Sequence, residues 1–218
     1  MTGRHTAFPL SLVVTGKHLL LVGGGPLGTD RLHTARRFDW HRITMIAEDA
    51  TPEIRAMAEE DERVTLHERA VCEDDVEATD LVIDSTTNIP LADTLASWCR
   101  PRRIPLNAMD KMECCDVHYP AFIERGPLLL AISSGGETPA LAGTLRRLLE
   151  KQVGPGWCNA ALLLAETRRS LPPGRERMDL LIDLARNKQW LEYIAENNRV
   201  ELRRMVDEAV DRLAAAPT

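Results

Sequence analysis

An apolar run that stops abruptly at glycine restricts the fold of this chain more than any other feature. Residues 17–30 read KHLLLVGGGPLGTD. The apolar residues 19–22 show no alternation with polar ones, which indicates a strand that is buried on both faces. Such strands occur in parallel sheets covered by helices on both sides. We therefore expect an α/β fold that begins with a buried strand and a glycine turn.

The glycine turn has the spacing of a dinucleotide-binding loop. Gly23, Gly25 and Gly28 form a GxGxxG pattern, in which the glycines serve the tight turn, close approach of a pyrophosphate and helix–strand packing. Pro26 and Leu27 would present backbone to the same pyrophosphate, which a helix N-terminus attracts. Short patterns of this kind also occur in turns that bind nothing, and that alternative stays open.

Composition restricts the classes of partner that this chain can bind. The chain has 218 residues, 44% hydrophobic and 28% charged, with a formal net charge of −6. This balance argues against a broad nucleic-acid surface or an anionic-membrane surface. No apolar run approaches the roughly 18 residues of a membrane helix, and the first 11 residues do not resemble a signal peptide. We expect a cytoplasmic protein that binds neither nucleic acid nor membrane.

The cysteine pattern suggests no disulfide framework. The five cysteines are odd in number and form no CxxC pair, so a structural zinc site is not indicated either. Cys114 and Cys115 are adjacent and would suit a soft metal, but free cysteine usually behaves as a small buried hydrophobe. The sequence assigns no metal ligand.

Strands alternate with helices over the first half of the chain. The pattern predicts an edge strand at 8–14, further strands at 41–47, 64–68, 81–83 and 104–109, and helices at 29–38, 52–60 and 91–99. This alternation is typical of a right-handed, Rossmann-like parallel sheet.

Polar residues follow two of the predicted strands. Glu48 follows Gly28 by 20 residues, the spacing at which a Rossmann unit places an acid on the cofactor ribose, and Asp49 is adjacent. The alternative is that Glu48 and Asp49 form an acidic turn that contacts only solvent. Thr86 lies in the polar segment 84–88, where open parallel sheets bind ligands, and we expect it beside the nicotinamide half of a dinucleotide.

The pattern changes after Asp110. A strand at 128–132 leads into a second glycine turn, SSGG at 133–136, and a helix over 140–152. The remainder is almost wholly helical, with a break at 171–174. These changes place domain boundaries near residues 112 and 152.

Three motifs now resemble a known family. NAMD at 107–110, CDVHYPA at 115–121 and SSGG at 133–136 are similar to those of precorrin-2 dehydrogenases, including the bifunctional dehydrogenase/ferrochelatases that form the amino-terminal module of sirohaem synthases. The resemblance implies a homodimer with an NAD-binding Rossmann-like domain at 1–112, a dimerisation segment at 113–152 and a small helical domain at 153–218.

The resemblance also implies an activity. It predicts NAD-dependent oxidation of the tetrapyrrole precorrin-2 to sirohydrochlorin, with insertion of iron or cobalt (Fe²⁺ or Co²⁺) as a second activity. Asp110 matches the proposed catalytic aspartate, which would accept a proton, and burial would suit it by raising its pKa. Substrate-site positions are Ser133, Ser134, Gly135 and Gly136. A chelatase without NAD chemistry and a dinucleotide-sensing regulatory module are the alternatives.

Some positions depart from the family pattern. His118 stands where the family is usually apolar, and it would either contact substrate or metal, or serve a structural role. Asp30 lies near the start of the first helix, where it would repel a pyrophosphate if it faced inward. Residues 84–88 also differ from the family. These departures concern the cofactor site more than the fold.

Overall fold

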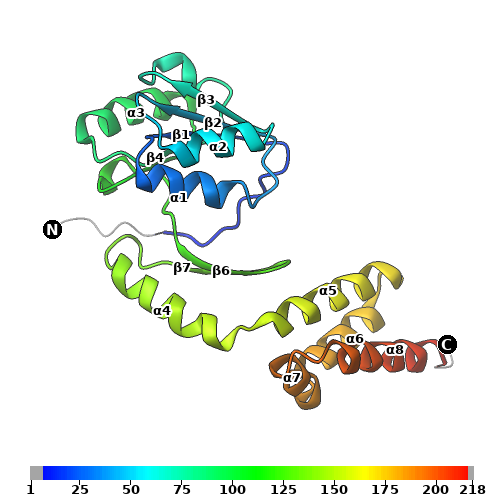
Figure 1. The fold of residues 1–218 in the computed structure, drawn as a ribbon. Coiled ribbons are helices and arrows are strands. Elements are labelled where there is room, and N and C mark those ends of the chain that lie inside the picture. Colours follow the sequence, from blue (N-terminus) through cyan, green and yellow to red (C-terminus); the bar gives the residue numbers. More distant parts are fainter. Residues whose placement is uncertain (1–6, 216–218) are drawn as a thin grey trace. The chain divides into compact units, whose positions relative to one another are not determined.

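The computed structural model describes residues 7–215 and contains two compact units, Met1–Tyr119 and Pro120–Thr218. Each unit is described by itself (Figure 1). The first unit holds five strands in the order β3-β2-β1-β4-β5, all parallel. The strands are β1 (His18–Val22), β2 (Arg42–Ala47), β3 (Val64–Glu68), β4 (Leu81–Asp84) and β5 (Leu106–Ala108). This sheet confirms the predicted Rossmann-like class.

Helices cover both faces of the sheet. They are α1 (Pro26–Ala35), α2 (Pro52–Glu60) and α3 (Ile89–Arg102), with short 3₁₀ turns η1 (Glu73–Val76) and η2 (Met112–Cys114). Helices α1 and α2 contribute to the hydrophobic cluster on one face, which contains Leu32 and Ile54. Helix α3 packs on the other face, where Leu95 is fully buried.

Local sequence signals set the helix starts. The predicted helix at 52–60 is α2, and the Thr51 hydroxyl caps it by accepting from the Ile54 N–H at 3.3 Å. Helix α1 begins at Pro26, three residues before the predicted start at 29, because proline is favoured in the first turn of a helix.

The predicted edge strand at 8–14 is wrong. Residues 7–14 have no strand conformation, and Phe8 is 82% exposed. An apolar pattern forms a strand only where a neighbouring strand offers hydrogen-bond partners, and Pro9 lacks an N–H. Within residues 7–215, the edges of the parallel sheet are β3 and β5 instead.

The second unit combines a hairpin with helices. Its elements are β6 (Ala121–Arg125), β7 (Leu128–Ile132), α4 (Pro139–Gln152), α5 (Pro155–Ser170), α6 (Arg175–Arg186), α7 (Lys188–Ala195) and α8 (Arg199–Ala215). The two strands are antiparallel, and α4 packs against them. The four last helices share a core around Trp190 and Leu202. Among the described residues, none of the helices is long and apolar enough to cross a membrane.

Two helix glycines provide a matched test of the packing between α1 and the sheet. A Cβ on Gly28 would lie 1.8 Å from the Gly23 carbonyl oxygen, whereas a Cβ on Gly143 would meet nothing closer than 3.9 Å. Gly28→Ala should therefore lower the free energy of unfolding by about 2–3 kcal/mol through overpacking. Gly143→Ala should raise it by about 0.5–1 kcal/mol, because alanine favours helix. Urea denaturation measures both, and equal effects would contradict the packing argument.

Candidate dinucleotide-binding and catalytic site

The predicted site residues of the first unit follow strands that end at one edge of the sheet. Val22 is in register with Ile46 on β2 and with Asp84 on β4, and Asp84 is in register with Ala108 on β5. The loops after β1, β2, β4 and β5 therefore share one carboxyl edge, which is where open parallel sheets bind ligands.

Each glycine of the GxGxxG pattern has a distinct geometric role. Gly23 has φ +108°, and a Cβ there would lie 2.8 Å from the Thr86 Cγ2. Gly28 permits the contact between α1 and the Gly23 carbonyl. Gly25 differs, because a Cβ there would meet nothing within 4 Å. The open side of Gly25 leaves room for a phosphate to approach the backbone, so these residues fit a dinucleotide.

The start of α1 suits an anion. Gly25 is the N-cap residue, no side chain caps the helix, and the first turn contains no acidic residue. Asp30 is exposed and lies beyond that turn. The helix dipole would therefore favour an anion such as a pyrophosphate at this position, with no acidic group in the same turn to oppose it.

The loop after β2 is tied to the glycine turn through Gly24, which the sequence analysis did not single out. The Gly24 carbonyl accepts from the Thr51 N–H at 3.0 Å, and a Cβ on Gly24 would lie 2.1 Å from the Asp49 carbonyl oxygen. Glu48 and Asp49 are both exposed, and Asp49 lies 3.5 Å from the Arg55 guanidinium. The middle glycine of the GGG run, which the GxGxxG pattern does not need, was the signal that could have identified this contact.

Asp84 is a buried acid at the end of β4. Its side chain is 1% exposed, and its Oδ1 accepts from the N–H (2.9 Å) and hydroxyl (2.7 Å) of Thr86. In the described part of the chain, nothing donates to Oδ2. Burial raises the pKa of the Asp84 carboxyl, because the charged form loses hydration. The carboxyl thus holds Thr86 against Gly23.

Asp110 lies just past β5 at the same edge. It has φ +57°, a left-handed conformation that is uncommon outside glycine. The side chain is exposed, so the described residues do not provide the burial that would suit a proton acceptor. Desolvation would have to come from a bound substrate.

The segment after Asp110 returns alongside β5. The Asn107 side-chain amide donates to the Val117 carbonyl at 2.9 Å. His118 is half-buried, and its role stays a prediction. The guanidinium of Arg31 lies 3.8 Å from the ring centroid of Tyr119, a cation–π contact that fixes this end of the unit to α1.

The two adjacent cysteines make structural contacts. Cys114 is buried and its thiol donates to Asp93 at 3.5 Å, while the Cys115 sulfur contacts the backbone of Ala108. Burial raises the pKa of both thiols. Across residues 7–215, no three His, Cys, Asp or Glu side chains gather as a metal site.

The second unit holds the SSGG turn. Gly135 and Gly136 have φ +64° and +81°, which explains the glycines. The Ser134 hydroxyl accepts from the Thr138 N–H at 3.0 Å, and the Ser133 hydroxyl accepts from the Gly135 N–H at 3.1 Å. The turn is thus held by its own serines.

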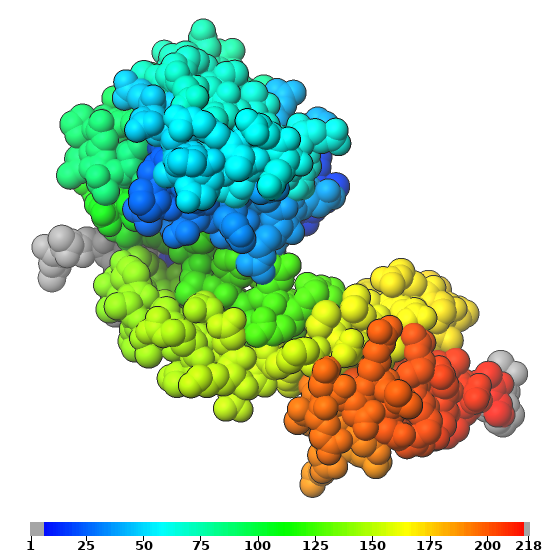
Figure 2. All heavy atoms as spheres, in the orientation of Figure 1, coloured from blue at the N-terminus to red at the C-terminus, as the bar shows by residue number. Residues whose placement is uncertain are grey.

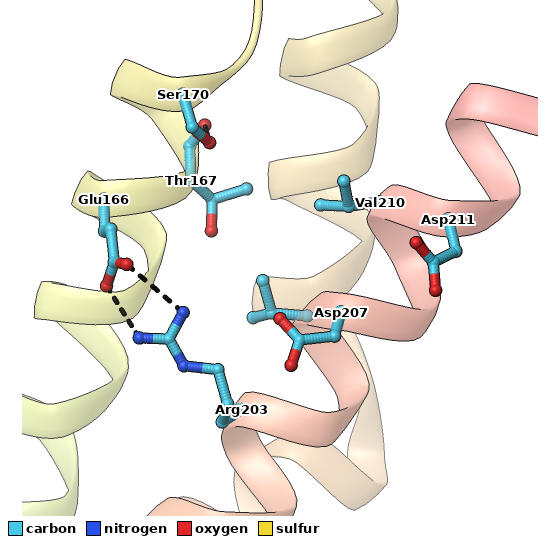
Figure 3. Close-up of a pocket in the computed structure, with 8 residues that line it drawn as sticks. Glu166, Thr167, Ser170, Arg203, Asp207, Val210 and Asp211 are labelled. Atoms are coloured by element: carbon cyan, nitrogen blue, oxygen red, sulfur yellow. Dashed lines mark hydrogen bonds and ion pairs between the residues drawn. The ribbon is translucent and has the colours of Figure 1, made fainter.

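A pocket of about 250 Å³ lies between α5 and α8 (Figure 3). The Arg203 guanidinium pairs with both carboxylate oxygens of Glu166 across it, at 2.8 and 3.3 Å. Thr167 at its base is satisfied by the Leu163 carbonyl. The pocket contains none of the predicted site residues, and its ion pair joins the two helices.

The five-stranded parallel sheet, the open glycine turn and the uncapped helix start define a Rossmann-like dinucleotide-binding protein. A comparison with protein families identifies the group. Residues 10–121, about half of the chain, match the NAD(P)-binding family NAD_binding_7, and the chain belongs to this family.

Comparison with individual proteins agrees with the motifs. The siroheme synthase of Thioalkalivibrio sulfidiphilus is 31% identical over 157 residues, which cover 72% of this chain and 32% of the relative. That of Pseudomonas paraeruginosa is 29% identical over 195 residues, 88% of this chain and 40% of the relative. The chain thus spans roughly a third of the length of these relatives.

Among solved structures, "SirC, precorrin-2 dehydrogenase" matches with a TM-score of 0.73 at 20% identity, covering 94% of this chain and 100% of that one. This likeness shows a shared fold. Together with the siroheme synthases, it confirms the resemblance drawn from the sequence motifs.

The raised pKa of Asp84 predicts a pH dependence of stability. The folded state holds this proton more tightly than the unfolded chain, so the free energy of unfolding falls as pH rises from the ordinary value of 3.8 to the higher folded pKa. Asp84→Asn keeps an acceptor for Thr86 but does not titrate. Urea denaturation across pH should therefore show a smaller loss of stability in this variant.

Asp80 provides a control of opposite sign. The His18 N–H and Lys17 lower the pKa of Asp80, so its contribution is present above pH 3.8 and is lost as pH falls through the folded value. Asp80→Asn should therefore reduce stability above that pH. If Asp84→Asn and the unchanged protein had the same pH dependence, the argument from burial would fail.

Proposed function

We propose that this chain is an NAD-dependent precorrin-2 dehydrogenase that forms sirohydrochlorin. The observation that carries the proposal is the position of Asp110, in the family motif at 107–110, at the same carboxyl edge as the open glycine turn. The siroheme synthase relatives and the SirC fold support it.

The residues of the carboxyl edge have separate roles in this proposal. Gly25, Pro26 and Leu27 present the start of α1 to the pyrophosphate. Glu48, which is exposed at the end of β2, accepts from the adenosine ribose, and Asp49 lies next to it. When bound, NAD supplies the hydride acceptor. An acid at the ribose favours NAD over NADP, whose extra phosphate calls for a cation.

Asp110 acts as the proton acceptor. Oxidation removes two hydrogens from the substrate, one as hydride and one as a proton. An exposed carboxylate can take that proton once substrate covers it and excludes water. In the second unit, the backbone N–H of Gly136 binds a carboxylate of the tetrapyrrole, while Ser133, which accepts from the Gly135 N–H, and Ser134 shape the turn.

We also propose that α4 and β7 belong to a homodimer interface. Leu141, Leu145 and Leu148 are exposed and lie on one face of α4, and Leu129 of β7 is exposed as well. Figure 2 shows atoms of α4, in yellow-green, at the surface of the second unit. A stripe of leucines in water is a common mark of an association surface.

Absorbance spectroscopy tests the dehydrogenase proposal. Mixing the protein with precorrin-2 and NAD should give sirohydrochlorin, and NADP should support a lower kcat/KM. Asp110→Asn should reduce kcat by at least 100-fold, because the amide cannot accept the proton. Asparagine also tolerates the left-handed backbone, so the variant should unfold at the same urea concentration as the unchanged protein.

Each alternative predicts a different result in the same assay. Turnover by Asp110→Asn at the normal rate would refute the catalytic role. Spectral change that needs Fe²⁺ or Co²⁺ but not NAD would favour a chelatase, and NAD binding without any tetrapyrrole chemistry would favour a regulatory module. Iron or cobalt insertion after oxidation would add the second activity that the resemblance implies.

Sedimentation velocity tests the dimer. Leu145→Glu places a charge in the leucine stripe and should give a monomer at concentrations where the unchanged chain is dimeric. Arg147→Glu introduces the same residue elsewhere on α4 and should stay dimeric. A monomeric unchanged chain, or a dimeric Leu145→Glu variant, would contradict the proposed interface.

A further inference from the structure

The backbone of Asp110 requires outside support. Its φ of +57° is sparsely populated for residues with a side chain, although aspartate and asparagine adopt it more readily than most. Such a conformation persists only where surrounding contacts hold it. The contacts of the adjoining residues therefore decide where the Asp110 carboxylate lies.

Backbone contacts hold the segment on both sides of Asp110. Upstream, the Met109 N–H donates to the Asp84 carbonyl at 3.0 Å. Downstream, the Lys111 carbonyl accepts from the Cys114 N–H at 3.1 Å and lies 3.4 Å from the Cys115 sulfur. Cys115 also contacts the Ala108 carbonyl at 3.2 Å, so it closes the loop around Asp110.

The side chain of Lys111 fixes this loop to α3. Lys111 is only 8% exposed, and its ammonium forms an ion pair with Asp93. Asp93 also accepts the Cys114 thiol at 3.5 Å. The pairing raises the pKa of Lys111 and lowers the pKa of Asp93, so both stay charged at neutral pH.

We propose that Lys111 and Asp93 are positioning residues for Asp110. Neither has to touch substrate. Their ion pair fixes the residue that follows Asp110 to a helix of the sheet unit, and so restricts the carboxylate to one place at the carboxyl edge. The catalytic part of this inference rests on the proposed function, while the restraint itself does not.

Two variants test the pair against a matched control, an ion pair that the same helix forms through Arg102. Lys111→Met and Asp93→Asn should each lower kcat about ten-fold, with the KM for NAD within two-fold of normal. Lys111→Arg, which keeps the charge, should recover most of kcat. Glu73→Gln removes a 3.0 Å ion pair with Arg102 near the other end of α3 and should leave kcat unchanged.

Hydrogen exchange measured by mass spectrometry gives a readout that does not need turnover. Amides of residues 108–115 should exchange at least ten-fold faster in Lys111→Met than in Glu73→Gln. Unchanged exchange would overturn the restraint, whatever the activity. If Lys111→Met had a normal kcat while Asp110→Asn was inactive, the positioning role would be refuted and the restraint of the loop would stand. Normal turnover by Asp110→Asn would refute the catalytic role of Asp110, and absence of turnover by the unchanged protein would refute the proposed function; in both cases exchange would still decide the restraint.

Discussion

The contact between Gly28 and the Gly23 carbonyl is the constraint on which the rest of the first unit depends. It lets α1 begin directly at the end of β1, where no larger residue would fit. The helix start then faces the carboxyl edge with its amides uncapped.

The same edge gathers groups of different chemistry. In the proposed function, the glycine turn offers backbone to an anion, Glu48 offers a carboxylate to a ribose hydroxyl, and Asp110 offers a carboxylate to a proton. Register between neighbouring strands brings them together, because Asp84 is level with both Val22 and Ala108. A shift of register by one residue would send every side chain of β4 to the other face.

The sequence allowed much of this to be predicted. Uninterrupted apolar strands, the helix at 52–60 and the spacing of three glycines depend on neighbours close in the chain, so they can be recognised locally. The contacts of Gly24 with the loop after β2 depend on tertiary packing. So does the pairing of Lys111 with Asp93, 18 residues away. The prediction of a strand at 8–14 was wrong for a related reason, because an apolar pattern does not show whether a partner strand is available.

The contacts of Gly24 have a consequence for how cofactor preference can change. The Gly24 carbonyl accepts from the Thr51 N–H, and the Cα of Gly24 packs against the Asp49 backbone. The loop after β2 and the glycine turn are therefore held together, and a change in one would shift the other. Lengthening or shortening the loop after β2 would disturb phosphate binding as well. If Glu48 binds the ribose as proposed, exchanging its exposed side chain would change cofactor specificity with less disturbance than remodelling the loop.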